Sequence, residues 1–411
     1  MANSKFIPTR KNLGDKSLAA VDGPMPLDFF RRASDFFGLA ARRVLALSLA
    51  GTLVLCVAGC GIAQGDDVSS AGDAAQQTNQ TVGQGASNGT ATSSDEIDVD
   101  DLFSDRDLDQ SYDAAEATSV ELKDEGTVAS GEGVAQDGST VTISAEGVYV
   151  LTGELSDGRV VVDAGEDAKV QLVLDGVSIS SSTGTSLYVR SADKVFVTTT
   201  QGSSNTLAAA GDATEEDDHT LDGTLFSVDD LTIGGEGTLI VSSAKGNGVV
   251  GKDEVTLTGG TLEVSAAEHA VQANDSVAVA AGTYELEAGK DGIHVSGGDE
   301  EDAGFLYVAG GTLTLSAGSD GIDADGDIQI DGGSITVNAG DDGIHSEAEL
   351  IVNDGTIDVQ TSKEGLEGAQ VTLNGGDTNV VSLDDGVNAT GEGSNSSRSE
   401  EHTSELQSRS D

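Results

Sequence analysis

The chain has 411 residues, with 72 acidic and 20 basic side chains, and therefore a formal net charge of −52. Such a charge excludes a nucleic-acid-binding protein, because phosphate backbones are bound through Lys and Arg, and it argues against direct adhesion to anionic lipid. Aromatic residues make up only 3% of the chain and Trp is absent, so platforms for stacking on neutral sugars are few.

Residues 1–59 have the pattern of a signal peptide with a long N-terminal region. Arg42 and Arg43 precede an apolar run at 44–58 that is too short to span a bilayer comfortably. The run ends in Val57-Ala-Gly-Cys60, which resembles the lipobox of bacterial lipoproteins; the alternative is an ordinary secretory signal with a chance cysteine. The resemblance implies that Cys60 is lipidated and holds the chain on the extracellular face of the bacterial cell membrane. We expect no other contact with the membrane.

Residues 60–110 follow this cysteine and are rich in Ser, Thr, Gln, Asn, Gly and Asp. Their low apolar content predicts a disordered tether. Cys56 would be removed with the signal peptide, so Cys60 would be the single cysteine left and no disulfide would form. We expect residues 111–133 to be an irregular lead-in or cap.

A repeat of about 22 residues occupies 134–397. Its most regular motif has central glycines at Gly292, Gly321, Gly343, Gly365 and Gly386, spaced by 29, 22, 22 and 21 residues. The first spacing is one unit plus an insertion around 297–304. Self-similarity at this period is typical of a solenoid in which each repeat is one turn.

Each unit also holds two short segments in which aliphatic and polar residues alternate, such as those at 312–316 and 327–331. Alternation and β-branched residues favour half-buried strands, and Gly-Gly pairs between them predict turns with positive φ. The fold class is therefore all-β, a right-handed parallel β-helix with about 22 residues per turn and three short faces. The interior ladders are expected to contain Leu313, Ile335 and Ile357, and the corner aliphatics Ile293, Ile322, Ile344, Leu366 and Val387. A β-sandwich with accidental periodicity is the alternative.

Residues 398–411 break the repeat and resemble the translation of a common sequencing-adapter oligonucleotide. We expect this segment to be an artefact, and the natural β-helix domain to continue with more turns. His402 therefore receives no functional role.

Acidic residues recur beside the repeat glycine at fixed positions. Position −1 holds Asp291, Asp320, Asp342, Glu364 and Asp385, position −2 holds Asp341 and Asp384, and position +2 holds Asp323, Glu367 and the neutral donor Asn388. Stacked carboxylates about 5 Å apart repel one another by on the order of 1 kcal/mol in water. Hard oxygen donors suit Ca²⁺, so the cofactor predicted for this corner is Ca²⁺.

Two alternatives to calcium stay open. Asp-Gly is good turn chemistry by itself, because Asp tolerates left-handed backbone conformations, although this accounts poorly for the Asp pairs at 341–342 and 384–385. A zinc site would need clustered imidazoles or thiolates. His294 and His345 share position +2, but the adjacent members of that row are acidic.

The strings at 339–345, 364–368 and 384–388 resemble a family of bacterial surface proteins described as carbohydrate-binding. The resemblance covers about residues 134–393 and implies a right-handed parallel β-helix, similar to pectate lyases, that binds calcium and polygalacturonate. The calcium ligands that it implies are Asp320, Asp323, Asp341, Asp342, Glu364, Glu367, Asp384 and Asp385.

Three functions are compatible with these features. The first is a monomeric, non-catalytic binder of acidic polysaccharide, in which Ca²⁺ bridges the carboxylates of protein and glycan. The second is a calcium-dependent polysaccharide lyase, whose base would be Lys290 or Lys363 at position −2, unless these lysines only compensate local charge. The third is a calcium-stiffened adhesive rod without sugar specificity. The candidate ligand-contacting residues are Lys290, Asp291, His294, His345, Lys363 and Asn388.

Overall fold

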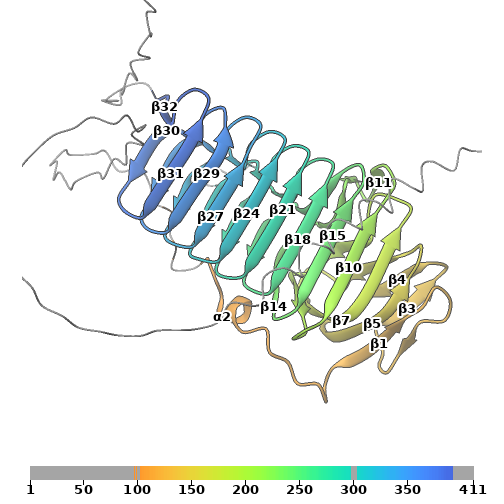
Figure 1. The fold of residues 1–411 in the computed structure, drawn as a ribbon. Coiled ribbons are helices and arrows are strands. Elements are labelled where there is room, and N and C mark those ends of the chain that lie inside the picture. The colour runs from red at the N-terminus through yellow and green to blue at the C-terminus, as the bar shows by residue number, and fades with distance from the viewer. Residues whose placement is uncertain (1–96, 98, 100–101, 298–302, 392–411) are drawn as a thin grey trace, which may run out of the picture. The chain divides into compact units, whose positions relative to one another are not determined.

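The computed structural model describes residues 97, 99, 102–297 and 303–391, and within them the chain is almost entirely β-structure (Figure 1). The signal peptide, Cys60 and the segment at 398–411 lie outside the described residues. The one described helix is α2 (Asp105–Leu108), and no described helix has the length and apolar character needed to cross a membrane.

Most strands belong to one long, parallel-rich sheet that winds as a solenoid with three faces, here called A, B and C. Face A contains β4 (Thr140–Ile143), β6 (Arg159–Asp163), β8 (Leu187–Ser191), β13 (Gly223–Ser227), β16 (Asn247–Gly251), β19 (Val271–Ala273), β22 (Ile293–Val295), β25 (Ile322–Ala324), the first parts of β28 (Ile344–Val352) and β30 (Leu366–Leu373), and β32 (Val387–Ala389).

Face B follows face A in each turn. It contains the first parts of β5 (Gly147–Leu155) and β7 (Lys169–Ser181), β9 (Lys194–Thr199), β14 (Asp230–Gly235), β17 (Glu254–Leu257), β20 (Ser276–Val279), β23 (Phe305–Val308), β26 (Ile328–Ile330), and the ends of β28 and β30.

Face C completes the turn, and its strands lie side by side at the front of Figure 1. It contains the ends of β5 and β7, β10 (Ser204–Ala209), β15 (Thr238–Ser243), β18 (Thr261–Ala266), β21 (Thr283–Ala288), β24 (Thr312–Ala317), β27 (Ser334–Asn338), β29 (Thr356–Ser362) and β31 (Asp377–Ser382).

Antiparallel strands decorate this coil. β2 (Val128–Ala129) pairs with β1 (Thr118–Leu122), and β3 (Val134–Asp137) pairs with β4. A separate hairpin joins β11 (Thr214–Glu216) to β12 (His219–Leu221). Its Leu221 packs with outward apolar side chains of face A, including Tyr188 and Phe226.

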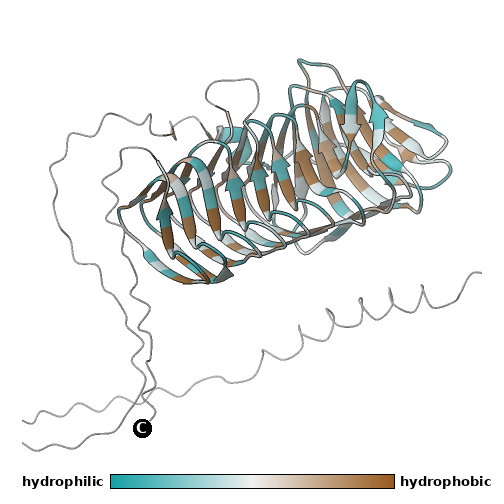
Figure 2. Cartoon of the chain, turned by 90° about the horizontal axis from the view of Figure 1, so that it is seen from above, coloured by the Kyte–Doolittle hydropathy of each residue, from teal (hydrophilic) through white to brown (hydrophobic). Residues whose placement is uncertain are grey.

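The predicted interior ladders are confirmed by the strand register. On face C, Leu313 pairs with Ile335 and Ile335 with Ile357, and all three side chains are buried. On face A, the corner aliphatics pair in series from Ile293 to Val387, which lies at the exposed last turn. Burial of each such side chain contributes about 1.5–3 kcal/mol, so the stacked interior is the main source of stability. Figure 2 shows the apolar positions as brown segments within the strands. The right-handed sense of the coil stays a prediction.

The expected glycine turns are also present. The second glycine of each Gly-Gly pair has a positive φ, with 70° at Gly260, 93° at Gly311, 89° at Gly333 and 76° at Gly376. Side chains with a Cβ rarely adopt this region, so these glycines fix the turn between faces B and C.

Two domain boundaries differ from the prediction. Residues 111–133 hold β1, which pairs in parallel with β5, so the stack is extended before Val134. The end of the segment predicted to be a disordered tether, 60–110, is ordered, because Asp107 is buried at 1% exposure against β9 and β14, where it contacts Lys194 and Thr232. Polar and ionic contacts with residues far away in the sequence hold this segment, and the repeat pattern does not predict them.

Candidate metal centre

Two rows of side chains run along the outside of face A. The first, called the rung row, is position −1 of the repeat and contains Asn247, His269, Asp291, Asp320, Asp342, Glu364 and Asp385. The second, called the strand row, is the outward position of successive face A strands and contains Gln272, His294, Asp323, His345, Glu367 and Asn388.

Each described carboxylate of the rung row from Asp291 to Asp342 accepts a hydrogen bond from the backbone of the next turn. The N–H of Asp320 lies 2.9 Å from Asp291 Oδ1, that of Asp342 lies 2.6 Å from Asp320 Oδ1, and that of Glu364 lies 3.3 Å from Asp342 Oδ1. Stacking of these acids therefore has a structural role in addition to any role in binding an ion.

The repeat glycine brings the turns into close contact at this corner. A Cβ on Gly343 would lie 2.5 Å from the carbonyl oxygen of Gly365 and 2.8 Å from Val359 Cγ1. Gly321 is equally crowded by Gly343 and Val337, and none of these glycines has a positive φ. Glycine is required here for close approach of neighbouring turns, rather than for the left-handed conformation that Asp-Gly turn chemistry would use.

In the strand row, Asp323 lies between two imidazoles. Its Oδ2 is 2.9 Å from His294 Nδ1, and its Oδ1 is 2.9 Å from His345 Nδ1. Burial acts to raise the pKa of Asp323, but the hydrogen bonds from both histidines outweigh it and hold that pKa well below its usual range. The same hydrogen bond to Asp323 raises the pKa of His345 to about 9.

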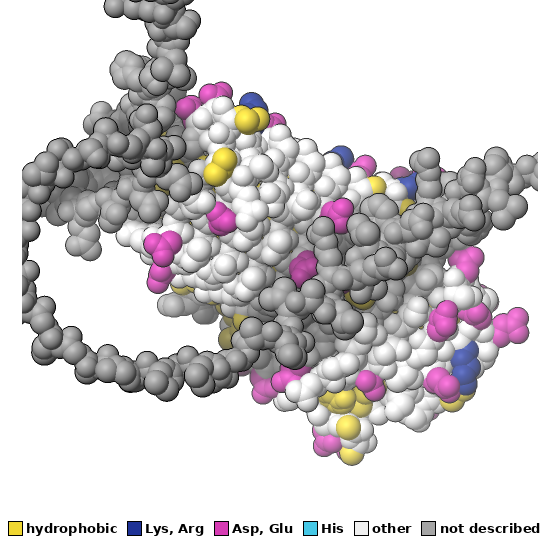
Figure 3. Space-filling view, in the orientation of Figure 1, with side chains coloured by type: hydrophobic (Ala, Val, Ile, Leu, Met, Phe, Trp, Pro, Cys, Tyr) yellow, Lys and Arg dark blue, Asp and Glu magenta, His cyan; other side chains and the backbone are white. Residues whose placement is uncertain are grey.

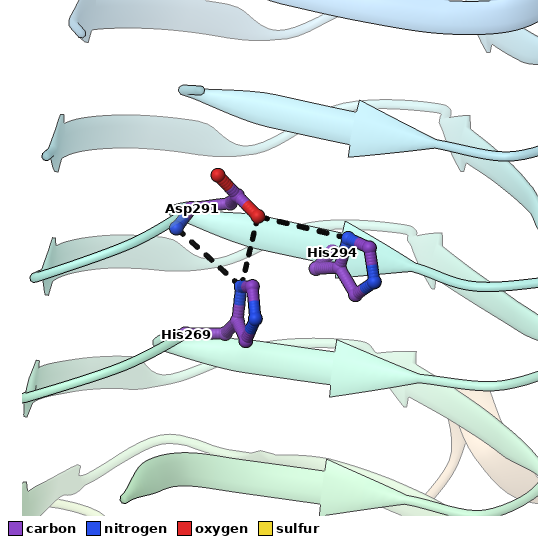
Figure 4. Close-up of side chains that lie close together, drawn as sticks. All are labelled: His269, Asp291 and His294. Atoms are coloured by element: carbon purple, nitrogen blue, oxygen red, sulfur yellow. Dashed lines mark hydrogen bonds and ion pairs between the residues drawn. The ribbon is translucent and has the colours of Figure 1, made fainter. Parts of the chain in front are cut away.

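The two rows together form three groups of potential metal donors, and within each group one donor atom per residue lies within 4.8 Å of the others. The groups are His269, Asp291 and His294; Asp320, Asp323 and His345; and Asp342, Glu364 and Glu367. Figure 4 shows the first group, in which the imidazole of His269 approaches the Asp291 carboxylate from the neighbouring turn and that of His294 approaches it from the same turn.

Burial and like charges perturb the acids of the other two groups. Burial, followed by the charges of Asp291 and Asp323, raises the pKa of Asp320 to about 6. Burial, together with the hydrogen bond and charge of Glu364, raises the pKa of Glu367 to about 7. Carboxyl groups that resist ionisation in this way are those that a bound cation would stabilise most.

Five of the eight predicted calcium ligands lie in these groups, and three do not. Asp341, Asp384 and Asp385 belong to none of the three groups. Asp341 instead pairs with Lys363 at 3.0 Å, on the exposed edge of the corner.

The remaining candidate contact residues divide in the same way. Asp291, His294 and His345 are members of the groups, whereas Asn388 donates to Glu364 Oε2 at 2.9 Å. Lys290 Nζ lies 3.1 Å from Glu268 Oε2 in the preceding turn. Lys290 and Lys363 of position −2 thus form ion pairs outside the rung row.

His269 is the donor that the sequence analysis missed. Its ring stacks on that of His294, with the centroids 4.6 Å apart and the planes 21° from parallel. The expectation that imidazoles would not cluster is therefore wrong for this pair. The signal was present in the sequence, because His269 precedes Asp291 by one repeat of 22 residues.

The chain is thus a parallel-rich β-solenoid that carries carboxylates and imidazoles along one face. The chain belongs to the family of carbohydrate-binding domain-containing proteins, whose family model matches residues 137–392. A carbohydrate-binding domain-containing protein of Acetivibrio thermocellus is 34% identical over 137 residues, which are 33% of this chain and 48% of the relative. The chain thus matches about half the length of that relative.

A solved structure has a similar fold. The polysaccharide lyase-like protein from C. thermocellum, solved as a gadolinium derivative, matches with a TM-score of 0.50 and 25% identity. The match covers 66% of this chain and 99% of that chain, which supports the β-helix-like architecture.

Proposed function

We propose that this protein binds acidic polysaccharide, of the polygalacturonate type, through Ca²⁺ held on face A, without cleaving it. A lipid on Cys60 would hold it on the extracellular face of the bacterial cell membrane. Membership of a carbohydrate-binding family supports a carbohydrate partner. The metal, the acidity of the glycan and the anchor are parts of the proposal.

The observation that carries the proposal is the group formed by Asp342, Glu364 and Glu367, three carboxylates from two adjacent turns. At an effective dielectric constant of about 20, two charges 4 Å apart interact by about 4 kcal/mol. Three acids with no basic side chain in their group are therefore unfavourable unless a proton or a cation is shared. Ca²⁺ takes six to eight oxygen ligands, so three carboxylates leave positions for water and for uronate oxygens.

Calcium bridging also explains how a chain of charge −52 can hold a polyanion. Without the ion, protein and glycan repel each other. The side of the solenoid seen in Figure 3 carries scattered acidic side chains and shows no histidine among its coloured residues. On face A, by contrast, carboxylates and imidazoles are grouped in two regular rows. We therefore assign glycan binding to these rows.

Lyase activity is the second candidate, because the structural neighbour is called lyase-like. β-Elimination needs a base that takes a proton next to the uronate carboxylate. Lys363 is a poor base, because its hydrogen bond to Asp341 raises its pKa further. Lys290 is paired with Glu268. These contacts favour binding without cleavage.

Co-sedimentation of the protein with insoluble polygalacturonate tests the proposal. We expect retention in Ca²⁺ and release in chelator, with the recovered polymer unchanged in length. The double variant Asp342→Asn, Glu364→Gln should lose retention, since amides remove the charge but keep hydrogen-bond acceptors. Asp137→Ala, on exposed β3, should behave as wild type.

Three outcomes would overturn or redirect this assignment. Equal retention in chelator would rule out the calcium bridge. Shortened polymer with unsaturated ends would establish the lyase. Calcium binding without retention on any uronate polymer would leave the stiffened rod.

A further inference from the structure

We propose that His269, Asp291 and His294 form a binding site for one divalent first-row transition ion such as Zn²⁺, separate from the acid-only group proposed for calcium. The site lies where the rung and strand rows pass from neutral amides to acids. The inference does not rest on the proposed function, because it concerns different donors and a different class of ion.

The donor set has the chemistry of a transition-metal site. Two imidazoles and one carboxylate suit Zn²⁺ and its neighbours, whereas Ca²⁺ prefers oxygen donors alone. Asp291 Oδ2 lies 2.9 Å from His269 Nδ1 and 3.7 Å from His294 Nδ1. Ligands of a tetrahedral zinc ion at about 2.0–2.1 Å are separated from one another by about 3.3 Å, so small side-chain rotations would close the site.

His269 Nδ1 faces two groups of Asp291, and no single protonation state of this nitrogen satisfies both. The same nitrogen faces the backbone N–H of Asp291 at 3.4 Å and the carboxylate oxygen of Asp291 at 2.9 Å. A protonated Nδ1 can donate to the carboxylate but cannot accept the N–H, and a bare Nδ1 accepts the N–H but repels the carboxylate. A cation between Nδ1 and the carboxylate removes this repulsion, and its bond to the Nδ1 lone pair takes the place of the N–H contact.

His294 is held by a second carboxylate. Asp323 Oδ2 contacts its Nδ1 at 2.9 Å, and this is the nitrogen that lies 3.7 Å from Asp291 Oδ2, so an ion at Nδ1 would replace the proton that His294 shares with Asp323. The site is mostly sheltered but open on one side, with 13% exposure for the His269 side chain, 8% for Asp291 and 21% for His294. Three protein ligands and an opening leave a position for water or for a ligand oxygen.

One repeat earlier along the stack, the equivalents of His269 and His294 form a matched amide pair. They are Asn247, in the rung row of the preceding turn, and Gln272, in the strand row of the same turn as His269, and Asn247 Nδ2 donates to Gln272 Oε1 at 3.0 Å. Asn247 Oδ1 also accepts the backbone N–H of His269 at 3.0 Å. The double variant His269→Asn, His294→Gln therefore copies a native pair into the next turn, and should fold.

The test uses the full chain, freed of metal and titrated with Zn²⁺ against a chromophoric chelator, with Co²⁺ as a spectroscopic probe. We expect the double variant to lose one equivalent of bound Zn²⁺ or to bind it about tenfold or more weakly. The visible bands of low-coordinate Co²⁺ should be lost with it. His219→Asn, on β12 of the hairpin, should retain both signals.

Two results would overturn the proposal. One is unchanged Zn²⁺ stoichiometry and affinity in the double variant when its thermal unfolding matches wild type. The other is full displacement of Co²⁺ by millimolar Ca²⁺, which would show that the ion sits among oxygen donors. If the double variant unfolds early, Asp291→Asn provides the same comparison, because its amide oxygen can still accept the N–H of Asp320.

Discussion

At the scale of single residues, the repeat glycine has a role that depends on its neighbours. Gly343 lies against Gly365 and Val359, whereas a Cβ on Gly386 would meet no atom of the described residues within 4 Å. Both occupy the same motif, and neither has a positive φ. The motif is therefore under steric constraint only where another turn packs on it.

Gly343→Ala is expected to lower the free energy of unfolding by about 1–3 kcal/mol, because the added methyl group overpacks the corner. Gly386→Ala should change it by less than about 0.5 kcal/mol. Urea unfolding of both variants measures the difference. Equal stability of the two would mean that the turns adjust freely at this corner.

Asp230 is a second residue with an effect that depends on its neighbours, because they shift the pKa of its carboxyl group. Burial, and then the charge of Glu254, raise the pKa of Asp230 to about 6. Lys194 lies 4.0 Å away but makes its closer contact, 3.0 Å, with Asp107. Because the pKa is higher in the folded chain than its ordinary value of 3.8, the contribution of Asp230 to stability should fall as the pH rises from about 4 to 6 and stay constant above.

Asp230→Asn should therefore raise the free energy of unfolding at pH 7.5 by about 1 kcal/mol, a value reduced for the partial exposure of the side chain. The gain should vanish near pH 4, where the native carboxyl is protonated. Thermal unfolding at the two pH values measures it. A gain of the same size at both would point to packing rather than charge.

At the scale of elements, the strands and their ladders could be predicted because each is specified locally and repeated. Leu313, Ile335 and Ile357 stack as expected, since alternation fixes which side chains point inward and the period fixes which of them meet. The segment around α2 could not be predicted. Asp107 finds Thr232 at a sequence separation of 125 residues, and no periodic pattern links the two.

Asp107→Ala is expected to destabilise the protein by about 2–3 kcal/mol, because Lys194 loses its close buried partner. Hydrogen exchange of residues 104–110 should accelerate more than that of the face C strands. Asp105→Ala, exposed in the same short helix, is the control. Identical exchange in both variants would show that other contacts hold this segment.

The candidate site was predicted in part for the same reason. Asp320, Asp323, Asp342, Glu364 and Glu367 are brought together because the repeat places them in register. Asp341 was assigned to the same centre, but its side chain points to Lys363 on the exposed edge. His269 was not assigned as a donor, because its unit of the repeat has Ala270 in place of the glycine and carries no acid at position −1.

At the scale of the whole molecule, a cation that binds only the folded chain would reduce the repulsion among its carboxylates and so stabilise the fold. Saturating Ca²⁺ should raise the free energy of unfolding, by about 2.7 kcal/mol at a concentration 100 times Kd. Chelator should remove this gain, and so should the variant Asp342→Asn, Glu364→Gln. Calorimetry with and without Ca²⁺ measures it, with Mg²⁺ at equal ionic strength as the control for screening. An equal shift with Mg²⁺ would contradict a calcium site.

The hydrogen bonds of the rung row have a consequence for the history of such proteins. The backbone N–H of the following turn is accepted by an amide side chain at Asn247 and by carboxylates at Asp291, Asp320 and Asp342. A neutral amide and a carboxylate both accept this hydrogen bond, so the contact does not specify the charge at the position. A single nucleotide change converts an Asn codon to one for Asp or His, and the fold tolerates all three residues at this position. Descendants of one ancestral solenoid can therefore change the charge of this row turn by turn while their architecture is inherited unchanged.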